Sequence, residues 1–273
     1  MRHGWDDGET ARLYDEHTRR YPGYRERAER LVVLAGIEPG MHVVDLACGT
    51  GVTTTEILRR LDGRGRVTAV DGAEALLAVA RTHLADTRVT WVQTRGESLD
   101  AVIEQPAEAV LCSAAFWQMR WPEAITAVRS TLRPGGVFAF NLPRQFFPRL
   151  FPKLPNPPGP SLGDRIMAVA VQEYGFVDPG PSSSAPPRPG SDLDSLATLL
   201  GDAGLRLERW ERFEQRLSTE EAVNWLRVPV FTDRLLPGFD YATRMAILDR
   251  ALVGYEPAAV ETSDWVQFRC LRE

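Results

Sequence analysis

Residues 43–51 read VVDLACGTG, and this stretch decides the fold. An apolar strand reaches an acid at Asp45 and then enters a glycine turn that leads into a helix. Glycine accepts positive φ angles and lets the backbone approach a ligand closely. The first turn of the following helix adds free N–H groups and the positive end of the helix dipole. The pattern is therefore typical of a turn that binds a ligand at the end of a strand.

A glycine turn after a strand also occurs in dinucleotide-binding domains, so the turn alone does not identify the ligand. The dinucleotide fingerprint is GxGxxG, in which the third glycine allows close packing of the helix. Counting Gly49 as the first glycine, the third position is Thr54. The sequence therefore disfavours an oxidoreductase that uses NAD.

Short apolar strands alternate with helices on both sides of this turn. The predicted strands are 41–47, 66–71, 88–93, 107–113 and 136–142, and the predicted helices between them are 52–61, 73–85 and 122–132. This alternation is typical of βαβ units and predicts an α/β fold with a parallel, doubly wound sheet. The strands are continuous apolar runs, which suits strands that are covered on both faces.

The rest of the chain predicts parts outside the sheet. Two helices over 9–36, separated at Pro22, form an expected N-terminal helical lid (1–36), followed by a binding core (37–142). Twelve of the 20 prolines fall in 143–190, which we interpret as a cap insertion that ends in a flexible loop at 176–190. Residues 191–273 are expected to complete the core and to carry a helical cap insertion at 218–260.

Composition narrows the possible partners. The net charge is -5 and Lys153 is the only lysine, so we expect no nucleic-acid partner. No apolar run is long enough for a membrane span and no signal peptide is visible, so we expect no membrane partner. Three widely spaced cysteines show no metal pattern and fit a reducing cytoplasm, and we predict no metal site. The N-terminal helices could mediate a homodimer.

Asp71 ends the second predicted strand, 26 residues after Asp45. An acid at this position can accept hydrogen bonds from both hydroxyls of a ribose. The alternative is that Asp71 only caps the next helix.

Taken together, these motifs resemble the class I S-adenosylmethionine-dependent methyltransferases, near their broad "type 11" small-molecule group. DLACGTG (45–51) is similar to the first motif of that family, with Ala47 in place of its first glycine. VDGAEALLAVAR (70–81) is similar to the second, and LRPGGVFAFNLP (132–143) to the turn and fifth strand. The resemblance implies a Rossmann-like, seven-stranded, mostly parallel sheet. Its antiparallel last strand would pair within a closing hairpin formed by 205–217 and 263–272.

The resemblance also implies a cofactor, S-adenosylmethionine, with S-adenosylhomocysteine as the product. The implied cofactor contacts are Asp45, Ala47, Gly49 and Gly51 around the methionine part, Asp71 on the ribose, Gly72 and Leu76 near the adenine, Gly96, Glu97 and Ser98 at the adenine edge, and Ser113 and Ala114 under the cofactor. The family often has an acid after the third strand for the adenine amino group. Arg95 stands there instead, which leaves the adenine contact open.

Methyl transfer is a direct displacement, so the enzyme must mainly align the reacting groups and exclude water. Tyr14 and His17 are the candidate catalytic residues: the resemblance places a tyrosine over the methyl group, and His17 could serve as a general base. The candidate substrate contacts are aromatic or polar side chains of the lid, strand ends and cap: Tyr14, Tyr21, Phe116, Trp117, Trp121, Asn141, Arg144, Phe147 and Trp225. They could instead only join the cap to the core, and Arg144 could bind an anion or pair with a cap carboxylate.

The sequence thus predicts methyl transfer from S-adenosylmethionine to a small molecule in specialised metabolism. The poor supply of histidine tilts the expected acceptor atom toward carbon or nitrogen. The alternative is an enzyme of the same fold that binds S-adenosylmethionine but catalyses a cyclisation or rearrangement without methylation. A non-enzymatic binding module is disfavoured, because both Asp45 and Asp71 are present.

Overall fold

The computed structural model describes residues 4–152, 160–177, 192–255 and 261–273. Its centre is one seven-stranded sheet with the strand order β3-β2-β1-β4-β5-β7-β6. The strands are β1 (His42–Leu46), β2 (Arg66–Asp71), β3 (Val89–Gln93), β4 (Ala107–Cys112), β5 (Leu132–Pro143), β6 (Leu205–Leu217) and β7 (Glu261–Arg272). The first five pair in parallel, and β7 lies antiparallel between β5 and β6. The predicted fold class is confirmed.

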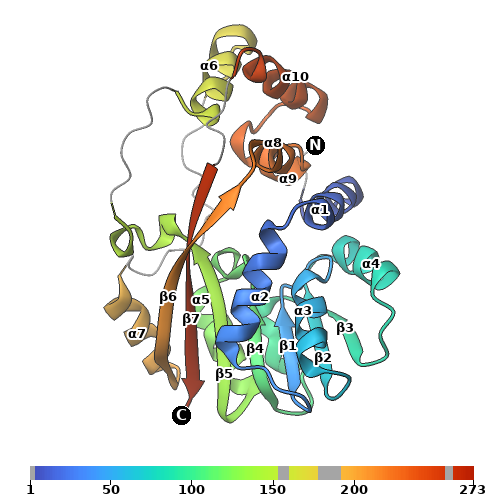
Figure 1. Cartoon of the computed structure of the whole chain (residues 1–273), viewed down its shortest axis with the longest axis vertical. Helices are drawn as coiled ribbons and strands as arrows, with labels where there is room; N and C mark the ends of the chain where they lie inside the picture. The colour runs from blue at the N-terminus through green and yellow to red at the C-terminus, as the bar shows by residue number, and fades with distance from the viewer. Residues whose placement is uncertain (1–3, 153–159, 178–191, 256–260) are drawn as a thin grey trace.

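Helices cover both faces of the sheet and gather at one end of it (Figure 1). The α-helices are α1 (Gly8–Arg20), α2 (Gly23–Ala35), α3 (Val52–Leu61), α4 (Glu74–His83), α5 (Trp121–Thr131), α6 (Leu162–Tyr174), α7 (Leu193–Asp202), α8 (Thr219–Leu226), α9 (Pro229–Leu235) and α10 (Tyr241–Leu252). Short 3-10 helices lie at Gly96–Ala101 (η1), Phe116–Gln118 (η2), Arg144–Phe146 (η3) and Pro148–Leu150 (η4).

The apolar strand β1 shows why the sheet is buried on both sides. Its neighbouring residues Val43 and Val44 are both fully buried but belong to different clusters. Val43 packs in the cluster that α2 and α3 complete, and Val44 packs in the cluster that α5 and α7 complete. Because successive side chains of a strand point to opposite faces, a continuous apolar run is what such a sheet needs.

Helices α6, α8, α9 and α10 stand beyond the carboxyl ends of the parallel strands, beside α1 (Figure 1). Helix α9 was not predicted, because it has only seven residues and its start, VPVF, is an apolar run without helical spacing. Pro229 is acceptable there because it occupies the first helical turn. The loop predicted at 176–190 lies largely outside the described residues. The division into lid, core and cap stays a prediction.

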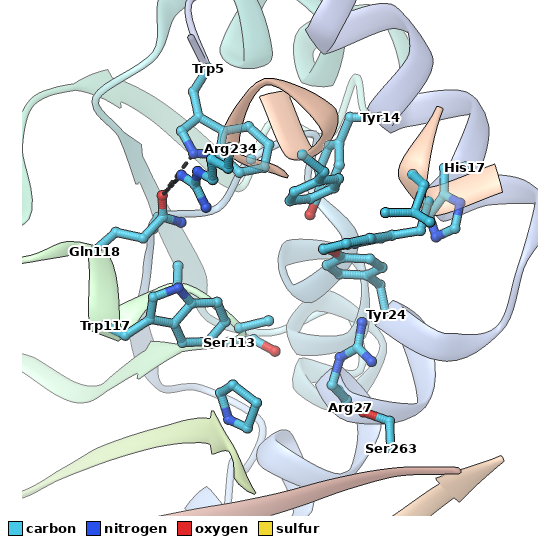
Figure 2. A pocket seen from close by; sticks show the side chains of 18 of the residues that line it. Trp5, Tyr14, His17, Tyr24, Arg27, Ser113, Trp117, Gln118, Arg234 and Ser263 are labelled. Carbon is cyan, nitrogen blue, oxygen red and sulfur yellow. Dashed lines mark hydrogen bonds between the residues drawn. The ribbon is translucent and has the colours of Figure 1, made fainter. Parts of the chain in front are cut away.

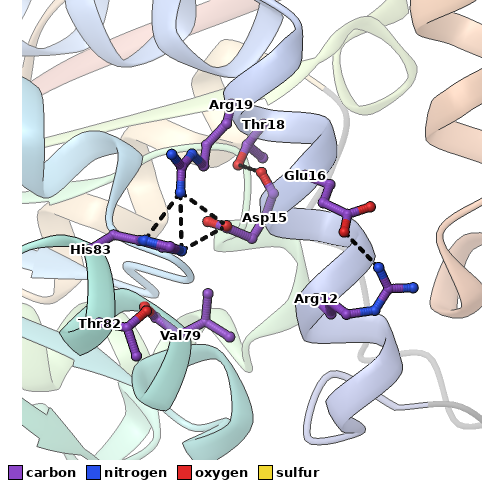
Figure 3. A network of polar contacts seen from close by, with 8 residues as sticks. All are labelled: Arg12, Asp15, Glu16, Thr18, Arg19, Val79, Thr82 and His83. Carbon is purple, nitrogen blue, oxygen red and sulfur yellow. Dashed lines mark hydrogen bonds and ion pairs between the residues drawn. The ribbon is translucent and has the colours of Figure 1, made fainter.

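A polar network fixes α1 beside α4 (Figure 3). Asp15 Oδ2 lies 3.0 Å from His83 Nε2 and 3.8 Å from Arg19 Nη1, and Arg19 Nη1 lies 3.0 Å from His83 Nδ1. Close by, Ala11 of α1 packs with Leu76 of α4. The network therefore holds the N-terminal helix next to the end of β2, where the glycine turn and Asp71 lie.

Candidate active site

A cavity of about 1010 Å³ lies at the carboxyl ends of the parallel strands, beneath the helices that gather there. Ligands of open α/β sheets bind at this edge. The cavity brings together most of the predicted site residues: Tyr14, His17, Ala47, Gly49, Asp71, Gly72, Leu76, Gly96, Glu97, Ser113, Ala114, Trp117 and Trp225. Its volume is at the upper end of the range for small-molecule sites, which leaves room for more than one ligand.

The glycine turn and Asp71 form one hydrogen-bonded unit. The Gly49 N–H donates to Asp71 Oδ2 at 2.8 Å, and the Ala73 N–H donates to Oδ1 at 2.9 Å. Ala47, Gly49 and Gly51 all have positive φ angles, so the turn uses the backbone freedom for which glycine is suited. Burial is the main effect on Asp71, and it raises the pKa of the carboxyl. Each Asp71 oxygen accepts one backbone bond and keeps a lone pair for a ligand.

Asp45 lies behind this turn and does not itself line the cavity. The Thr54 hydroxyl donates to its Oδ2 at 2.6 Å, whereas Oδ1 is buried and has no hydrogen-bond partner among the described residues. Burial raises the pKa of Asp45 to about 7, and the negative charge of Asp71 adds to the shift. A buried carboxyl with an unpaired oxygen is costly unless a cation or donor approaches it.

The ends of β3 and β4 line the far side of the turn. Gly96 packs closely there: a Cβ atom would lie 2.5 Å from Met119 Sδ, so a larger residue would require the Met119 side chain to shift. Glu97 lines the cavity but accepts a hydrogen bond from the Arg120 N–H at 2.9 Å, and Ser98 lies outside the lining. Arg95, which departs from the family pattern, also lines the cavity.

Asn141 lies behind the cavity wall and affects the site through the residues that it hydrogen-bonds. It is fully buried on β5, and its Oδ1 accepts a hydrogen bond from the Ala114 N–H at 2.7 Å. Its Nδ2 lies 3.4 Å from Ser113 Oγ. Ala114 has a φ of 55°, so this bond stabilises a turn that costs a non-glycine residue some strain. Asn141 is thus placed to position Ser113 and Ala114, which line the cavity, and not to contact a substrate.

The two candidate catalytic residues lie on the same helix and both line the cavity. Tyr14 packs over the glycine turn: a Cβ atom on Gly49 would lie 3.5 Å from Tyr14 Cε1. Burial raises the pKa of Tyr14 well above its ordinary value, so the phenol is neutral. His17 Nδ1 lies 2.9 Å from Asn224 Oδ1, and burial lowers the pKa of the imidazole, so His17 is also neutral at pH 7.

Besides Asn141, five predicted substrate contacts do not line the cavity. Phe116 and Trp121 lie in the hydrophobic core, and Phe147 packs on Phe268. The η2 turn explains the first case, because it directs Phe116 into the core and the next residue, Trp117, into the cavity.

The other two are polar residues with protein partners. The Tyr21 hydroxyl donates to Glu220 Oε1 at 3.0 Å, and Arg144 forms an ion pair with Asp264 at 2.5 Å. The cavity lining therefore excludes six of the predicted substrate contacts: Tyr21, Phe116, Trp121, Asn141, Arg144 and Phe147.

Several lining residues were missed from the sequence: Trp5, Tyr24, Arg27, Gln118, Arg234 and Trp265. Figure 2 shows Trp117 and Ser113 facing Tyr24 and Arg27 across the cavity. Trp5 Nε1 and Arg234 Nη2 both donate to Gln118 Oε1, at 2.7 and 3.0 Å. These residues come from α2, β7, α9 and the loops, so no local motif marks them. The one available signal was the i, i+3 spacing of Tyr24 and Arg27 on one helix.

Comparisons with known proteins agree with this geometry. Residues 43–136 match the model of a family described as "Methyltransferase domain". A trans-aconitate 2-methyltransferase of Azoarcus sp. (strain BH72) is 31% identical over 82% of this chain and 78% of its own length. That of Variovorax paradoxus (strain S110) is 27% identical over 80% of each chain. The trans-aconitate 2-methyltransferase of Delftia acidovorans is 30% identical over 51% of this chain. That match spans about half (49%) of the length of that relative.

Solved structures share the fold at low sequence identity. A putative methyltransferase of Bacillus halodurans C-125 has a TM-score of 0.55 at 15% identity, over 90% of this chain and 99% of its own. A geranyl diphosphate methyltransferase in complex with SAM has a TM-score of 0.53 at 16% identity, over 98% and 92%. The [4+2]-cyclase SpnF has a TM-score of 0.51 at 18% identity, over 89% and 81%.

Proposed function

Because the chain belongs to the class I S-adenosylmethionine-dependent methyltransferases, we propose that it methylates a small acceptor of specialised metabolism held in an aromatic pocket. The enzyme takes the methyl group from S-adenosylmethionine, the cofactor of this family. One observation carries the proposal: a single cavity has the glycine turn and Asp71 at one side and the rings of Tyr24, Trp117 and Trp265 at the other. The three cysteines are buried free thiols, which supports a reducing, cytoplasmic setting.

The residues around the turn fit the cofactor. Asp71 would accept hydrogen bonds from the ribose hydroxyls through the lone pairs that its two backbone donors leave free. The unpaired Oδ1 of Asp45 would be stabilised by the positive charge of the methionine ammonium group. Gly49 brings the backbone close to the ligand, and Tyr14 covers the same turn from the N-terminal helix.

When bound, S-adenosylmethionine supplies an electrophilic methyl group on a sulfonium. The chain's contribution is to hold the acceptor's nucleophile in line with that methyl group and to keep water out. Helices α1, α2, α8 and α9 contribute lining residues and cover the site. Tyr14 is neutral, so its ring can lie near the sulfonium and attract it while its hydroxyl orients the ligand.

His17 is the proposed base where the acceptor must lose a proton. If the Asn224 amide oxygen faces it, Nδ1 carries the proton and Nε2 is left as an acceptor. Nε2 has no hydrogen-bond partner among the described residues, and His17 is neutral at pH 7 because burial lowers its pKa. Both conditions suit a residue that takes up a proton during the reaction.

The test of the cofactor site is calorimetric titration of S-adenosylhomocysteine and of NAD, with Asp71→Ala and a surface control, Asp202→Ala. We expect binding of S-adenosylhomocysteine but not of NAD, with affinity about 10- to 100-fold weaker in Asp71→Ala because hydrogen bonds to a charged group are lost. Normal affinity in Asp202→Ala controls for loss of a surface charge. If the folded wild-type protein does not bind S-adenosylhomocysteine, the proposal fails.

A non-methylating cyclisation is the second candidate, because the fold is shared with a [4+2]-cyclase. The two functions differ in their products. Methyl transfer forms one S-adenosylhomocysteine for each acceptor consumed, whereas a cyclisation consumes acceptor and leaves S-adenosylmethionine unchanged. Mass spectrometry of both species in one reaction therefore separates them.

A further inference from the structure

Arg27 is a buried cation of the cavity wall that forms no ion pair with a described residue. It lies on α2, is 5% exposed and lines the cavity. Its Nη1 donates to Gln215 Oε1 at 2.5 Å. Nε is buried without a partner, and Nη2 has no hydrogen bond to any described residue. The structure shows no ion pair between Arg27 and a carboxylate within the described part of the chain.

The surroundings explain why no protein carboxylate neutralises this charge. Gln215 Nε2 donates to the Gly23 carbonyl oxygen at 2.8 Å and to Glu26 Oε2 at 2.9 Å. These two bonds orient the amide, so its oxygen must face Arg27. The other nearby acid, Glu221, accepts a hydrogen bond from the Gly23 N–H at 3.2 Å. Both acids accept hydrogen bonds from other groups and act on Arg27 only through their charge, at more than ion-pair distance, so the direct partner of Arg27 is a neutral amide.

Aromatic rings lie close to the guanidinium, so a ligand would meet it along its edge. Arg27 Cζ lies 4.2 Å from the centroid of Tyr24 and 4.5 Å from that of Trp265. The rings thus cover the guanidinium. Gln215 takes one of the two N–H groups of Nη1. Nε and Nη2 have no partner among the described residues and form an edge of two parallel N–H donors in one plane.

This edge lies where two aromatic walls of the cavity meet (Figure 2). Tyr24 packs on Tyr14 at 5.3 Å between ring centroids, and Tyr14 in turn covers Gly49 of the cofactor turn. Trp265 lies 6.1 Å from Trp117 on the other wall. A ligand group bound at Arg27 would therefore have its remaining atoms between these rings, on the way to the turn.

We infer that the methyl acceptor carries a carboxylate, which binds the Nε–Nη2 edge of Arg27 while its apolar or aromatic body lies between the two walls. This inference rests on the proposed function, since it assigns the acceptor of that same site. The two parallel donors can bind two oxygens of a carboxylate or of a phosphate. We favour the carboxylate, because a phosphate would bring further charged oxygens between the aromatic rings of Tyr24 and Trp265. Because a buried charge without a directly paired counter-charge is costly, the acceptor's carboxylate would supply the direct partner that the described fold omits.

The test compares an acid with its neutral amide of the same shape, and adds a phosphate probe. trans-Cinnamate, trans-cinnamamide and phenyl phosphate are titrated by calorimetry into protein saturated with S-adenosylhomocysteine, using wild type, Arg27→Met and Arg27→Lys. Arg30→Met is the matched control, because Arg30 lies one turn further on α2 and is exposed. We expect wild type and Arg30→Met to bind cinnamate at least about tenfold more tightly than the amide. Arg27→Met should lose this preference, and Arg27→Lys should keep only part of it because lysine lacks the two-donor edge.

The wild-type result decides the inference even if Arg27→Met does not fold. Equal affinity for cinnamate and its amide, tighter binding of phenyl phosphate, or no binding of cinnamate at about 10 mM would each overturn it. A preference that persists in folded Arg27→Met would also overturn it. Binding of S-adenosylhomocysteine is measured separately in every variant: its absence in wild type refutes the proposed function, and its presence without a carboxylate preference refutes only this inference.

Discussion

Replacing Asp45 by Asn removes a buried carboxyl whose pKa is raised to about 7. In the unfolded chain the pKa of aspartate is about 3.9. The folded protein therefore holds this proton more tightly than the unfolded chain. The resulting stability is fully present below about pH 4 and is lost as the pH rises to about 7, so wild type should become less stable over that range while Asp45→Asn lacks this change.

The two pKa values give the magnitude. Relative to low pH, where Asp45 is protonated in both states, the free energy of unfolding falls by about 1.5 kcal/mol at pH 5 and by about 4 kcal/mol at pH 8. Wild type should thus lose about 2.6 kcal/mol more than Asp45→Asn between these two pH values. Effects of the substitution that do not depend on pH, such as a changed bond to Thr54, cancel in this difference.

The assay is urea unfolding followed by tryptophan fluorescence at pH 5 and pH 8, without cofactor. Asp202→Asn serves as an exposed control and should follow wild type. Asp71 is present in every variant, and since its charge contributes to the raised pKa of Asp45, part of the measured difference belongs to the pair. If wild type and Asp45→Asn respond to pH alike, to within about 0.5 kcal/mol, Asp45 is not a high-pKa carboxyl and the reasoning is refuted.

Three further predictions concern neighbouring parts of the site. By calorimetry, Tyr14→Phe should bind S-adenosylhomocysteine within about twofold of wild type, whereas Tyr14→Ala should bind it about tenfold more weakly because the ring packs on Gly49. An equal loss of affinity in both variants would show that the hydroxyl matters instead. Asp15→Ala should weaken the same binding about threefold and change the free energy of unfolding by no more than about 1 kcal/mol, since its partners are exposed; unchanged affinity would argue against a role for this network in the site. Phe116→Ala should lower the free energy of unfolding by about 3–5 kcal/mol in urea, whereas Trp117→Ala should chiefly weaken acceptor binding, and the reverse pattern would contradict their placement.

The parallel sheet could be predicted from sequence because each strand carries its own signal. The strand predicted at 66–71 matches β2, and the one predicted at 205–217 matches β6. Helix α9 was missed because its seven residues are too few to display helical periodicity.

In the structure described, no helix is long and apolar enough to cross a membrane.

The cofactor side of the cavity could also be anticipated, since its residues follow one another in short motifs. Gly49 and Asp71 end neighbouring strands, and their hydrogen bond follows from that adjacency. The acceptor side could not, because Arg27 and Trp265 are more than 200 residues apart and meet only when β7 pairs beside β5. Phe116 and Trp117 show a finer limit: the same motif supplied both, and only the geometry of a three-residue turn decides which one reaches the cavity.

Arg144 and Arg27 differ in whether a protein carboxylate pairs with the guanidinium. The sequence left two roles open for Arg144: binding an anionic group of the substrate, or pairing with a carboxylate of the cap. In the structure Arg144 pairs with Asp264 at 2.5 Å, so its charge is already neutralised and a substrate anion would have to displace a protein carboxylate. Arg27 instead faces the Gln215 amide, which occupies a donor without neutralising the charge. Arg27 lines the cavity and forms no ion pair with a described residue, which supports placing the acceptor's carboxylate at Arg27 and not at Arg144.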